Sequence, residues 1–204
     1  MITIREVKSN ENKLINDIVT IHLDTFTGFF LTFMGRGFLK QMYQSYCDHT
    51  ESGLLVATEN EKAIGFLAYS RNFSGLYKYM IKTRLLQFGR YSVSAFFRRP
   101  STFMRLIRAF LKPSEAKREE QYVELSSIGV NPSIQSKGVG SLLIDELKKT
   151  VDFNKFAYIT LETDAINNEN AIHFYEKNGF VKERMYETKE GRKMIEYRFA
   201  GEKL

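Results

Sequence analysis

Hydrophobic and polar positions along the first half of the chain follow two periods, which predict strands and helices in turn. Residues 2–7 alternate between apolar and polar side chains, as a half-buried strand does. Residues 10–26 and 35–49 instead repeat apolar side chains every three or four positions, which predicts two amphipathic helices. Two short apolar runs follow, residues 54–57 and 63–69, and the turn between them predicts a β-hairpin.

The second half of the chain is more regular and predicts four strands and two helices. The expected strands are residues 122–130, 156–161, 180–187 and 194–199, and the expected helices are residues 138–151 and 168–177. The unbroken apolar run in residues 156–161 predicts a strand that is buried on both faces. Strands and helices in this order predict an α/β domain in which helices cover a mixed sheet.

A separate segment, residues 75–120, lies between the predicted hairpin and the regular second half. It contains apolar stripes with helical spacing at residues 76–88, 93–97 and 102–111. We therefore expect one domain over residues 1–204 that carries a helical insertion at 75–120.

Length and cysteine content narrow the class of protein. A chain of 204 residues can bury a core without metal or disulfide staples, and the single cysteine, Cys47, cannot form an intrachain disulfide. Residues 2–7 lack the apolar core of a secretory signal, and the apolar stretch at 26–33 is too short to cross a bilayer. These features predict a cytoplasmic protein that does not cross a membrane.

The positive charge is concentrated in the insertion. The whole chain has a formal charge of +6, whereas residues 75–118 alone hold eleven Lys or Arg and one acid, Glu115. Three interpretations stay open for this segment: a solvated helical lid, a surface that binds an anionic acceptor such as a nucleotide-linked amino sugar, or peripheral contact with an anionic membrane through residues 102–112. Nucleic acid is disfavoured as a partner, because the basic residues interleave with a packing pattern.

A glycine turn between a predicted strand and a predicted helix is the strongest local signal of a binding site. Gly138 and Gly140 begin the helix soon after the strand that ends at Val130, and Lys137 precedes them. Free N–H groups and the positive end of the helix dipole at such a turn favour a pyrophosphate. The turn lacks the glycine patterns of dinucleotide-binding and P-loop proteins, and an ordinary strand-to-helix turn is the alternative.

Two motifs in the second half resemble those of one enzyme family. The spacing Gln135-x-x-Gly138-x-Gly140 after a strand is similar to the acyl-CoA motif of the GNAT superfamily of N-acetyltransferases. Residues 168–180 are similar to the family's Asn-x-x-Ala-x-x-x-Tyr-Glu-Lys-x-Gly-Phe segment, and the order of elements matches across nearly the whole chain. The resemblance implies the GNAT fold, a mixed and mostly antiparallel sheet with splayed central parallel strands, flanking helices and, in this chain, the helical insertion.

The resemblance also implies a co-substrate, acetyl-CoA. In the family, pantetheine lies in the gap between the two splayed strands, here 122–130 and 156–161, and bonds backbone groups near Ile128 and Val130. Asn168 falls on the position whose side chain meets the pantetheine arm. The pyrophosphate is expected on the turn formed by Gln135, Ser136, Lys137, Gly138, Val139, Gly140 and Ser141.

The chemistry of acetyl transfer to an amine sets the candidate catalytic residues. It requires a neutral amine and a proton for the leaving thiolate, and it needs no covalent intermediate. Tyr175 falls on the family's tyrosine, and the resemblance implies that it supplies this proton; packing of its helix on the sheet is the alternative. Cys47 is expected to be a small buried residue with no catalytic role.

Glu124 is the second catalytic candidate, because some relatives carry a general base six residues before the position of Val130. A carboxylate on a buried strand is costly without a partner or a function, so an ion pair with an Arg of the insertion is the alternative. Strict alternation assigns the strand residues to two faces: Glu124, Ser126 and Ile128 on one, and Leu125, Ser127 and Gly129 on the other.

The first predicted helix and the residues after it are where the resemblance places the amine acceptor. The candidate acceptor-binding residues are His22, Asp24, Phe29 and Phe30, and aromatic packing is the alternative for them. Residues 28–35 are weakly similar to GNAT enzymes encoded among bacterial surface-polysaccharide genes, which favours an amino sugar. No His or Cys cluster has the spacing of metal ligands.

These observations predict an N-acetyltransferase that moves the acetyl group of acetyl-CoA to a primary amine of a small acceptor, such as a nucleotide-linked amino sugar, by direct attack in a ternary complex. Acetylation of a peptide or protein amine is the alternative within the enzyme class. A non-catalytic acyl-CoA-binding or membrane-associated module is the alternative outside it. The sequence indicates no oligomeric state.

Overall fold

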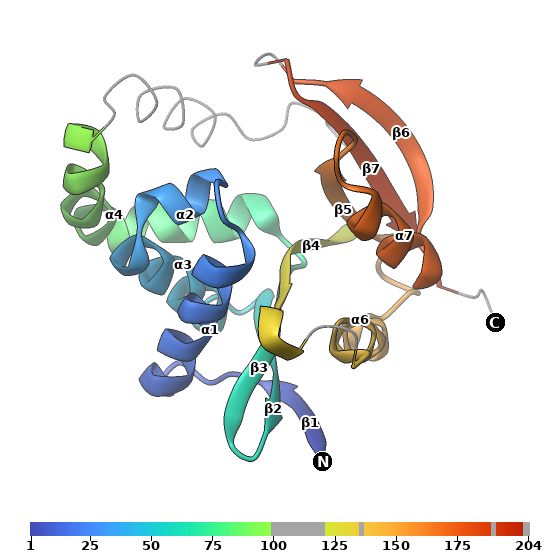
Figure 1. The fold of residues 1–204 in the computed structure, drawn as a ribbon, viewed down its shortest axis with the longest axis horizontal. Coiled ribbons are helices and arrows are strands. Elements are labelled where there is room, and N and C mark those ends of the chain that lie inside the picture. The colour runs from blue at the N-terminus through green and yellow to red at the C-terminus, as the bar shows by residue number, and fades with distance from the viewer. Residues whose placement is uncertain (99–120, 135–136, 189–190, 202–204) are drawn as a thin grey trace.

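The protein folds around one seven-stranded sheet with helices on both faces (Figure 1). The computed structural model describes residues 1–98, 121–134, 137–188 and 191–201. The strands are β1 (Ile2–Glu6), β2 (Ser52–Glu59), β3 (Lys62–Ser70), β4 (Tyr122–Val130), β5 (Tyr158–Asp164), β6 (Val181–Glu187) and β7 (Lys193–Phe199). Their order in the sheet is β1-β2-β3-β4-β5-β7-β6, and every neighbouring pair is antiparallel except β4 and β5. The expected mixed, mostly antiparallel sheet with a central parallel pair is confirmed.

Two helical layers cover this sheet. The helices are α1 (Asn12–Thr25), α2 (Phe30–Met34), α3 (Arg36–Asp48), α4 (Phe73–Arg98), α6 (Val139–Thr150) and α7 (Glu169–Lys177), with a 3-10 turn, η1, at Pro132–Ile134. Figure 1 shows α1 to α4 on one side of the sheet, and α6 and α7 on the other. A separate apolar core fills each side: Ile15, Leu39 and Phe66 are fully buried in the first, and Leu143 and Ile159 in the second.

None of the helices in the part of the chain that the structure describes is long and apolar enough to cross a membrane.

The insertion begins with a single long helix. The sequence predicts separate helical pieces at 76–88 and 93–97, but α4 runs without a break through 26 residues. Gly89, between the two pieces, does not interrupt it, because glycine lowers helix stability by only about 1 kcal/mol relative to alanine. The third predicted helical piece, residues 102–111, lies outside the described residues. The interpretation of the chain as a single domain stays a prediction.

The short helix α2 was not predicted from the sequence. It has only five residues, too few for a helical repeat of apolar positions to be visible. Gly28 and Gly35 bracket it with φ angles of +85° and +87°, a backbone conformation that glycine adopts without strain. The two glycines therefore let the chain reverse twice between α1 and α3.

The parallel strands β4 and β5 separate after a short stretch of pairing. They pair only at Tyr122 with Tyr158, Val123 with Ile159 and Glu124 with Thr160. Beyond these residues β4 continues beside β3 as far as Val130, while β5 continues beside β7 as far as Asp164. The expected splay between the two strands is therefore present, and it opens a gap in the middle of the sheet.

A β-bulge in β4 overturns the strict alternation expected for this strand. Ser127 lies opposite Ala68 but Leu125 lies opposite Tyr69, so β4 holds one extra residue, Ser126, at this point. An extra residue shifts every later side chain to the other face. Glu124 and Ser127 consequently share the face covered by α1 to α4, whereas Ile128 lies with Leu125 on the face of α6. The predicted grouping of Ile128 with Glu124, and that of Ser127 with Leu125, was wrong.

Candidate active site

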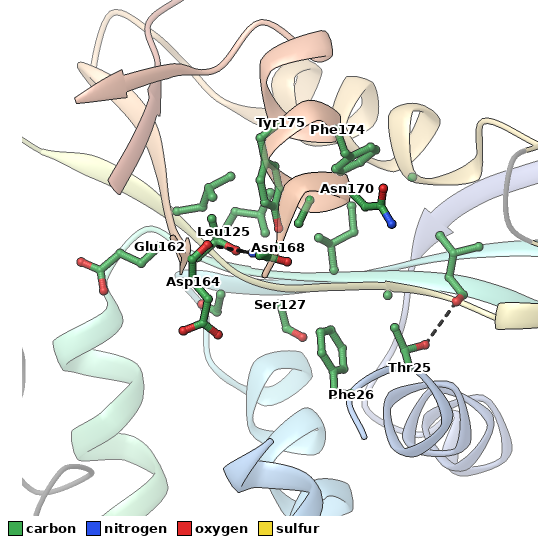
Figure 2. A pocket seen from close by; sticks show the side chains of 18 of the residues that line it. Thr25, Phe26, Leu125, Ser127, Glu162, Asp164, Asn168, Asn170, Phe174 and Tyr175 are labelled. Carbon is green, nitrogen blue, oxygen red and sulfur yellow. Dashed lines mark hydrogen bonds between the residues drawn. The ribbon is translucent and has the colours of Figure 1, made fainter. Parts of the chain in front are cut away.

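A cavity of about 940 Å³ occupies the gap between β4 and β5. Its lining comes from the separated halves of these two strands, the first turn of α6, the length of α7, the end of α1 with the segment after it, and the start of β7. Figure 2 shows that it reaches both faces of the sheet: Tyr175 and Phe174 lie on the side of α6 and α7, and Phe26 and Ser127 on the opposite side. We call this space the splay cavity.

The N-terminus of α6 forms one end of the splay cavity. Gly138 caps this helix with φ +75°, and the cavity is lined by Gly138, Val139, Gly140 and Ser141. The first hydrogen bond of the helix runs from the N–H of Leu142 to the Gly138 carbonyl at 3.1 Å, so the amides of Val139, Gly140 and Ser141 have no partner within the helix. Lys137 is exposed and is not part of the lining, and Gln135 and Ser136 lie outside the described residues.

The two glycines of this turn have different roles. A Cβ atom on Gly138 would meet nothing within 4 Å, so the left-handed conformation and open space are what this position provides. A Cβ atom on Gly140 would come within 2.9 Å of the Phe174 ring, so glycine there allows α6 and α7 to pack closely. The backbone conformation at the N-terminus of α6 therefore depends on Gly138, and the close packing of α6 against α7 depends on Gly140.

The wall formed by β4 and α1 is held by a side-chain hydrogen bond. Ile128 and Val130, the two expected backbone contacts, both line the splay cavity. The Thr25 hydroxyl donates a hydrogen bond to the Val130 carbonyl at 3.2 Å, drawn as a dashed line in Figure 2. This bond joins the end of α1 to the end of β4, and sequence analysis did not identify Thr25.

Asn168 holds the turn between β5 and α7. Its side-chain amide donates to the Thr163 hydroxyl at 2.7 Å and to the Asp164 carbonyl at 3.0 Å. These two bonds employ the amide hydrogens, so the side-chain oxygen of Asn168 is the atom with which it can accept a bond from a ligand. The residue lines the splay cavity at the expected place.

The side chain of Tyr175 extends from α7, and its hydroxyl points into the splay cavity (Figure 2). Its ring packs against Phe174, Phe180 and Tyr197, with centroid distances of 5.3, 6.1 and 6.0 Å. Burial raises the pKa of Tyr175 to about 12, so the phenol is protonated at neutral pH and able to donate. Within the described ranges, no residue forms a hydrogen bond with this hydroxyl. Packing and a directed proton donor are thus combined in one side chain.

Glu124 lies in a second, smaller cavity of about 310 Å³, which we call the side cavity. The side cavity is enclosed by β4, α2, α3 and α4, and it shares Leu31, Ser126 and Ser127 with the splay cavity. Burial, and secondarily the negative charge of Glu124, raises the pKa of Tyr46 in the same wall. The β4 bulge explains the shared residues, because it brings Ser126 and Ser127 together where the two cavities meet.

Only some of the residues predicted to bind the acceptor line the splay cavity in the structure. His22 and Phe29 line the splay cavity, whereas Asp24 is exposed and outside it, and the side chain of Phe30 is not described. His22 is 3% exposed and packs on Phe26 with a ring distance of 4.7 Å. Burial lowers the pKa of His22 to about 4, so this imidazole is neutral at physiological pH.

Carboxylates on β5 add negative charge to the side of the sheet that Glu124 faces. Glu162 and Asp164 line the splay cavity and, by the alternation of β5, share the face of Thr160, the partner of Glu124. Arg192 holds Asp164 through both carboxylate oxygens at 2.8 and 2.9 Å. Sequence analysis did not single out these residues, because only the splay shows that they stand beside a cavity.

The sequence predicts no catalytic role for Cys47 and no metal site. Cys47 is partly buried on α3 and lines neither cavity, and burial raises the pKa of its thiol to about 12. In residues 1–98, 121–134, 137–188 and 191–201, no three His, Cys, Asp or Glu side chains are grouped so that they could hold a metal ion.

Comparison with known proteins identifies the family. The model of the acetyltransferase (GNAT) family matches residues 15–180, which is most of the chain. The chain belongs to this family. Comparison with curated protein sequences finds no match. As a GNAT protein, the chain is an acyltransferase by family, and its splayed strands and glycine turn fall within the matched residues.

Solved structures share the GNAT fold over nearly the whole chain. A GNAT-family acetyltransferase from Bacillus cereus is 16% identical, with a TM-score of 0.60 and coverage of 98% of this chain and 97% of that one. NAA60 from Arabidopsis thaliana, solved in complex with acetyl-CoA, is 16% identical, with a TM-score of 0.59 and 98% coverage of both chains. Ard1 from Thermoplasma volcanium is 16% identical, with a TM-score of 0.60 and coverage of 98% and 97%. At these identities the likeness concerns the fold.

Proposed function

We propose that this GNAT protein transfers the acetyl group of acetyl-CoA to the primary amine of a small acceptor, by direct attack in a ternary complex. The observation that carries the proposal is the arrangement of the splay cavity. A helix N-terminus stands at one end, the Tyr175 hydroxyl points into it, and the side cavity with Glu124 opens beside it. A fold relative solved with acetyl-CoA supports the choice of co-substrate.

The lining of the splay cavity fits coenzyme A in three places. The amides of Val139, Gly140 and Ser141, which have no partner within the helix, would bind the pyrophosphate, aided by the partial positive charge of the helix end. The edge of β4 that lost its partner strand, at Ile128 to Val130, would bond the amide groups of the pantetheine arm. The oxygen of the Asn168 side chain would accept a further hydrogen bond from that arm.

Tyr175 and Glu124 provide two of the proton transfers that the reaction needs. Glu124 accepts a proton from the ammonium form of the acceptor, which leaves a neutral amine able to attack the thioester carbonyl. A carbon–nitrogen bond forms and the carbon–sulfur bond breaks, while Tyr175 donates its hydroxyl proton to the leaving sulfur. The nitrogen loses its second proton to water as the amide forms, Tyr175 regains a proton from water, and Glu124 releases its proton to solvent. A phenol with a pKa near 12 retains this proton until a thiolate is present to take it.

His22 is not suited to be the general base, although it lines the splay cavity. With a pKa near 4 it has little affinity for a proton at neutral pH. Its Nδ1 atom is also occupied by the Tyr43 hydroxyl at 2.6 Å. We therefore assign the proton acceptance to Glu124 and a structural role to His22.

The proposed function is tested by thiol release from acetyl-CoA with a panel of amines. We expect release that depends on both enzyme and amine, and mass spectrometry should find the acetylated amine as the product. Tight binding of coenzyme A without turnover on any amine would contradict the proposal and favour a non-catalytic acyl-CoA-binding module. Turnover on peptides or proteins alone would overturn the small acceptor.

A further inference from the structure

We infer that the side cavity binds the apolar body of the acceptor, and that the acceptor is a small primary amine attached to an aromatic or aliphatic group. This inference rests on the proposed acetyl transfer, and it names the class of amine. It departs from the amino sugar that the sequence suggested. Four properties of the side cavity support this inference: its position, its lining, the wall that α4 gives it, and its size.

The position of the side cavity suits an acceptor. It borders the splay cavity at Leu31, Ser126 and Ser127, which line both spaces, so molecules bound in the two cavities would be neighbours. Ser127 points from the bulge toward the side of the sheet that α1 to α4 cover (Figure 2). An amine whose body fills the side cavity can therefore direct its nitrogen past the two serines toward the thioester.

The lining of the side cavity is mostly apolar, with the hydroxyl groups of Tyr46, Tyr77, Ser126 and Ser127 and one carboxylate, and it favours an apolar body with one positive charge. Met42, Leu76 and Met80 are 6%, 1% and 4% exposed, and they supply the deep walls. Among the described lining residues Glu124 alone carries a charge. The hydroxyl groups of a sugar would lose their bonds to water against such walls, whereas an aromatic or aliphatic group would gain by leaving water.

One face of α4 forms a whole side of this cavity. The lining residues Phe73, Leu76, Tyr77 and Met80 are spaced three, four and seven positions from the first, which places them along a single helical stripe. Further along α4, Arg84 donates to the Gln41 side chain on α3 at 2.6 Å and forms an ion pair with Asp48. These bonds hold the stripe against α3, so the start of the insertion gives the acceptor pocket a firm wall.

The size of the side cavity bounds the acceptor. A volume of about 310 Å³ equals that of roughly ten water molecules in the liquid, at about 30 Å³ each. An amine of about ten non-hydrogen atoms, such as 2-phenylethylamine, matches this volume. Hexylamine fills most of it, and ethanolamine leaves most of it empty.

The test measures kcat/KM at saturating acetyl-CoA for 2-phenylethylamine, hexylamine, ethanolamine, glucosamine and a dipeptide amide with N-terminal phenylalanine. Each buried methylene is expected to raise kcat/KM roughly fourfold, so 2-phenylethylamine and hexylamine should exceed ethanolamine at least tenfold. Equal or higher values for ethanolamine or glucosamine would overturn the apolar acceptor and leave acetyl transfer intact. Turnover of the dipeptide amide alone would overturn the small amine, and no turnover on any amine would overturn the proposed function as well.

A matched pair of variants on α4 tests the location. Phe73 is 36% exposed and lines the side cavity, whereas Leu86 is 85% exposed and outside both cavities. Phe73→Ser should lower the ratio of kcat/KM for 2-phenylethylamine over ethanolamine about tenfold, and Leu86→Ser should leave this ratio unchanged. An unchanged ratio in Phe73→Ser, with the melting temperature and the KM for acetyl-CoA retained, would overturn the location.

Discussion

The Nδ1 atom of His22 lies 2.6 Å from the hydroxyl oxygen of Tyr43, in a buried hydrogen bond between α1 and α3. The same hydroxyl is 3.5 Å from the Ser127 hydroxyl at the β4 bulge. Two helices and the bulged strand are therefore joined by polar side chains directly beneath the splay cavity. Because the imidazole is buried and neutral, this arrangement makes stability depend on pH.

We expect the free energy of unfolding to fall as the pH drops from about 6.5 to about 4. The unfolded chain binds a proton at His22 near pH 6.5, whereas the folded protein resists it until about pH 4. Stability is thus complete above the unfolded pKa and is lost as the pH falls through this range, by about 3 kcal/mol at 1.36 kcal/mol per pKa unit. Urea denaturation at several pH values measures the loss.

His22→Phe is the control for this pH effect. The variant keeps an aromatic ring beside Phe26 and Phe66 and removes the titrating group. The pH dependence of the variant should be shallower than that of the wild type between pH 6.5 and 4.5, and parallel curves would contradict the assignment. Glu11, whose pKa the Arg5 hydrogen bond lowers to about 2, has its effect at lower pH, between 4.5 and 2.

Tyr175→Phe should lower kcat by roughly ten- to a thousandfold, in the range of general-acid contributions. The ring contacts with Phe174, Phe180 and Tyr197 remain in this variant, so the fold and the affinity for coenzyme A should be retained. Steady-state kinetics together with calorimetric titration of coenzyme A make the measurement. A kcat equal to that of the wild type would assign Tyr175 to packing alone.

Glu124→Gln should lower kcat/KM for the amine roughly a hundredfold at neutral pH, since the variant cannot accept the ammonium proton. The defect should shrink as the pH approaches the pKa of the amine, because solvent then removes that proton. Glu162→Gln, which alters an exposed carboxylate of the splay cavity, is the matched control. A larger defect in the Glu162 variant would transfer the role of base to that residue.

Gly138→Ala should weaken binding of coenzyme A several-fold. A Cβ atom at φ +75° costs about 1–2 kcal/mol of backbone strain, and relief of that strain would turn the amides of the α6 N-terminus away from the cavity. Gly179→Ala imposes a similar strain at φ +80° outside the splay cavity. If calorimetry finds the same coenzyme affinity in both variants, the pyrophosphate site is elsewhere.

The sequence alone determined most of the elements that surround the site. The bounds of β4 were predicted as residues 122–130 and are confirmed, because alternation begins the strand clearly and Pro132 ends it. The starts of α6 and α7 were predicted to within one residue, because apolar positions with helical spacing begin just after Gly138 and Asn168. Such signals are carried by neighbouring residues, so they can be read without a partner strand or helix.

Only the tertiary structure decided how these elements form two connected cavities. The residues Glu-Leu-Ser-Ser-Ile of β4 look like plain alternation, and the bulge at Ser126 exists only in the pairing with β3. The side cavity joins Leu31, Met42, Phe73 and Glu124, which are far apart in the sequence and show no common pattern. A local sequence pattern reports the secondary structure that a residue prefers, whereas a cavity is the space that remains after distant segments have packed. This packing placed Glu124, the predicted base, beside an apolar pocket.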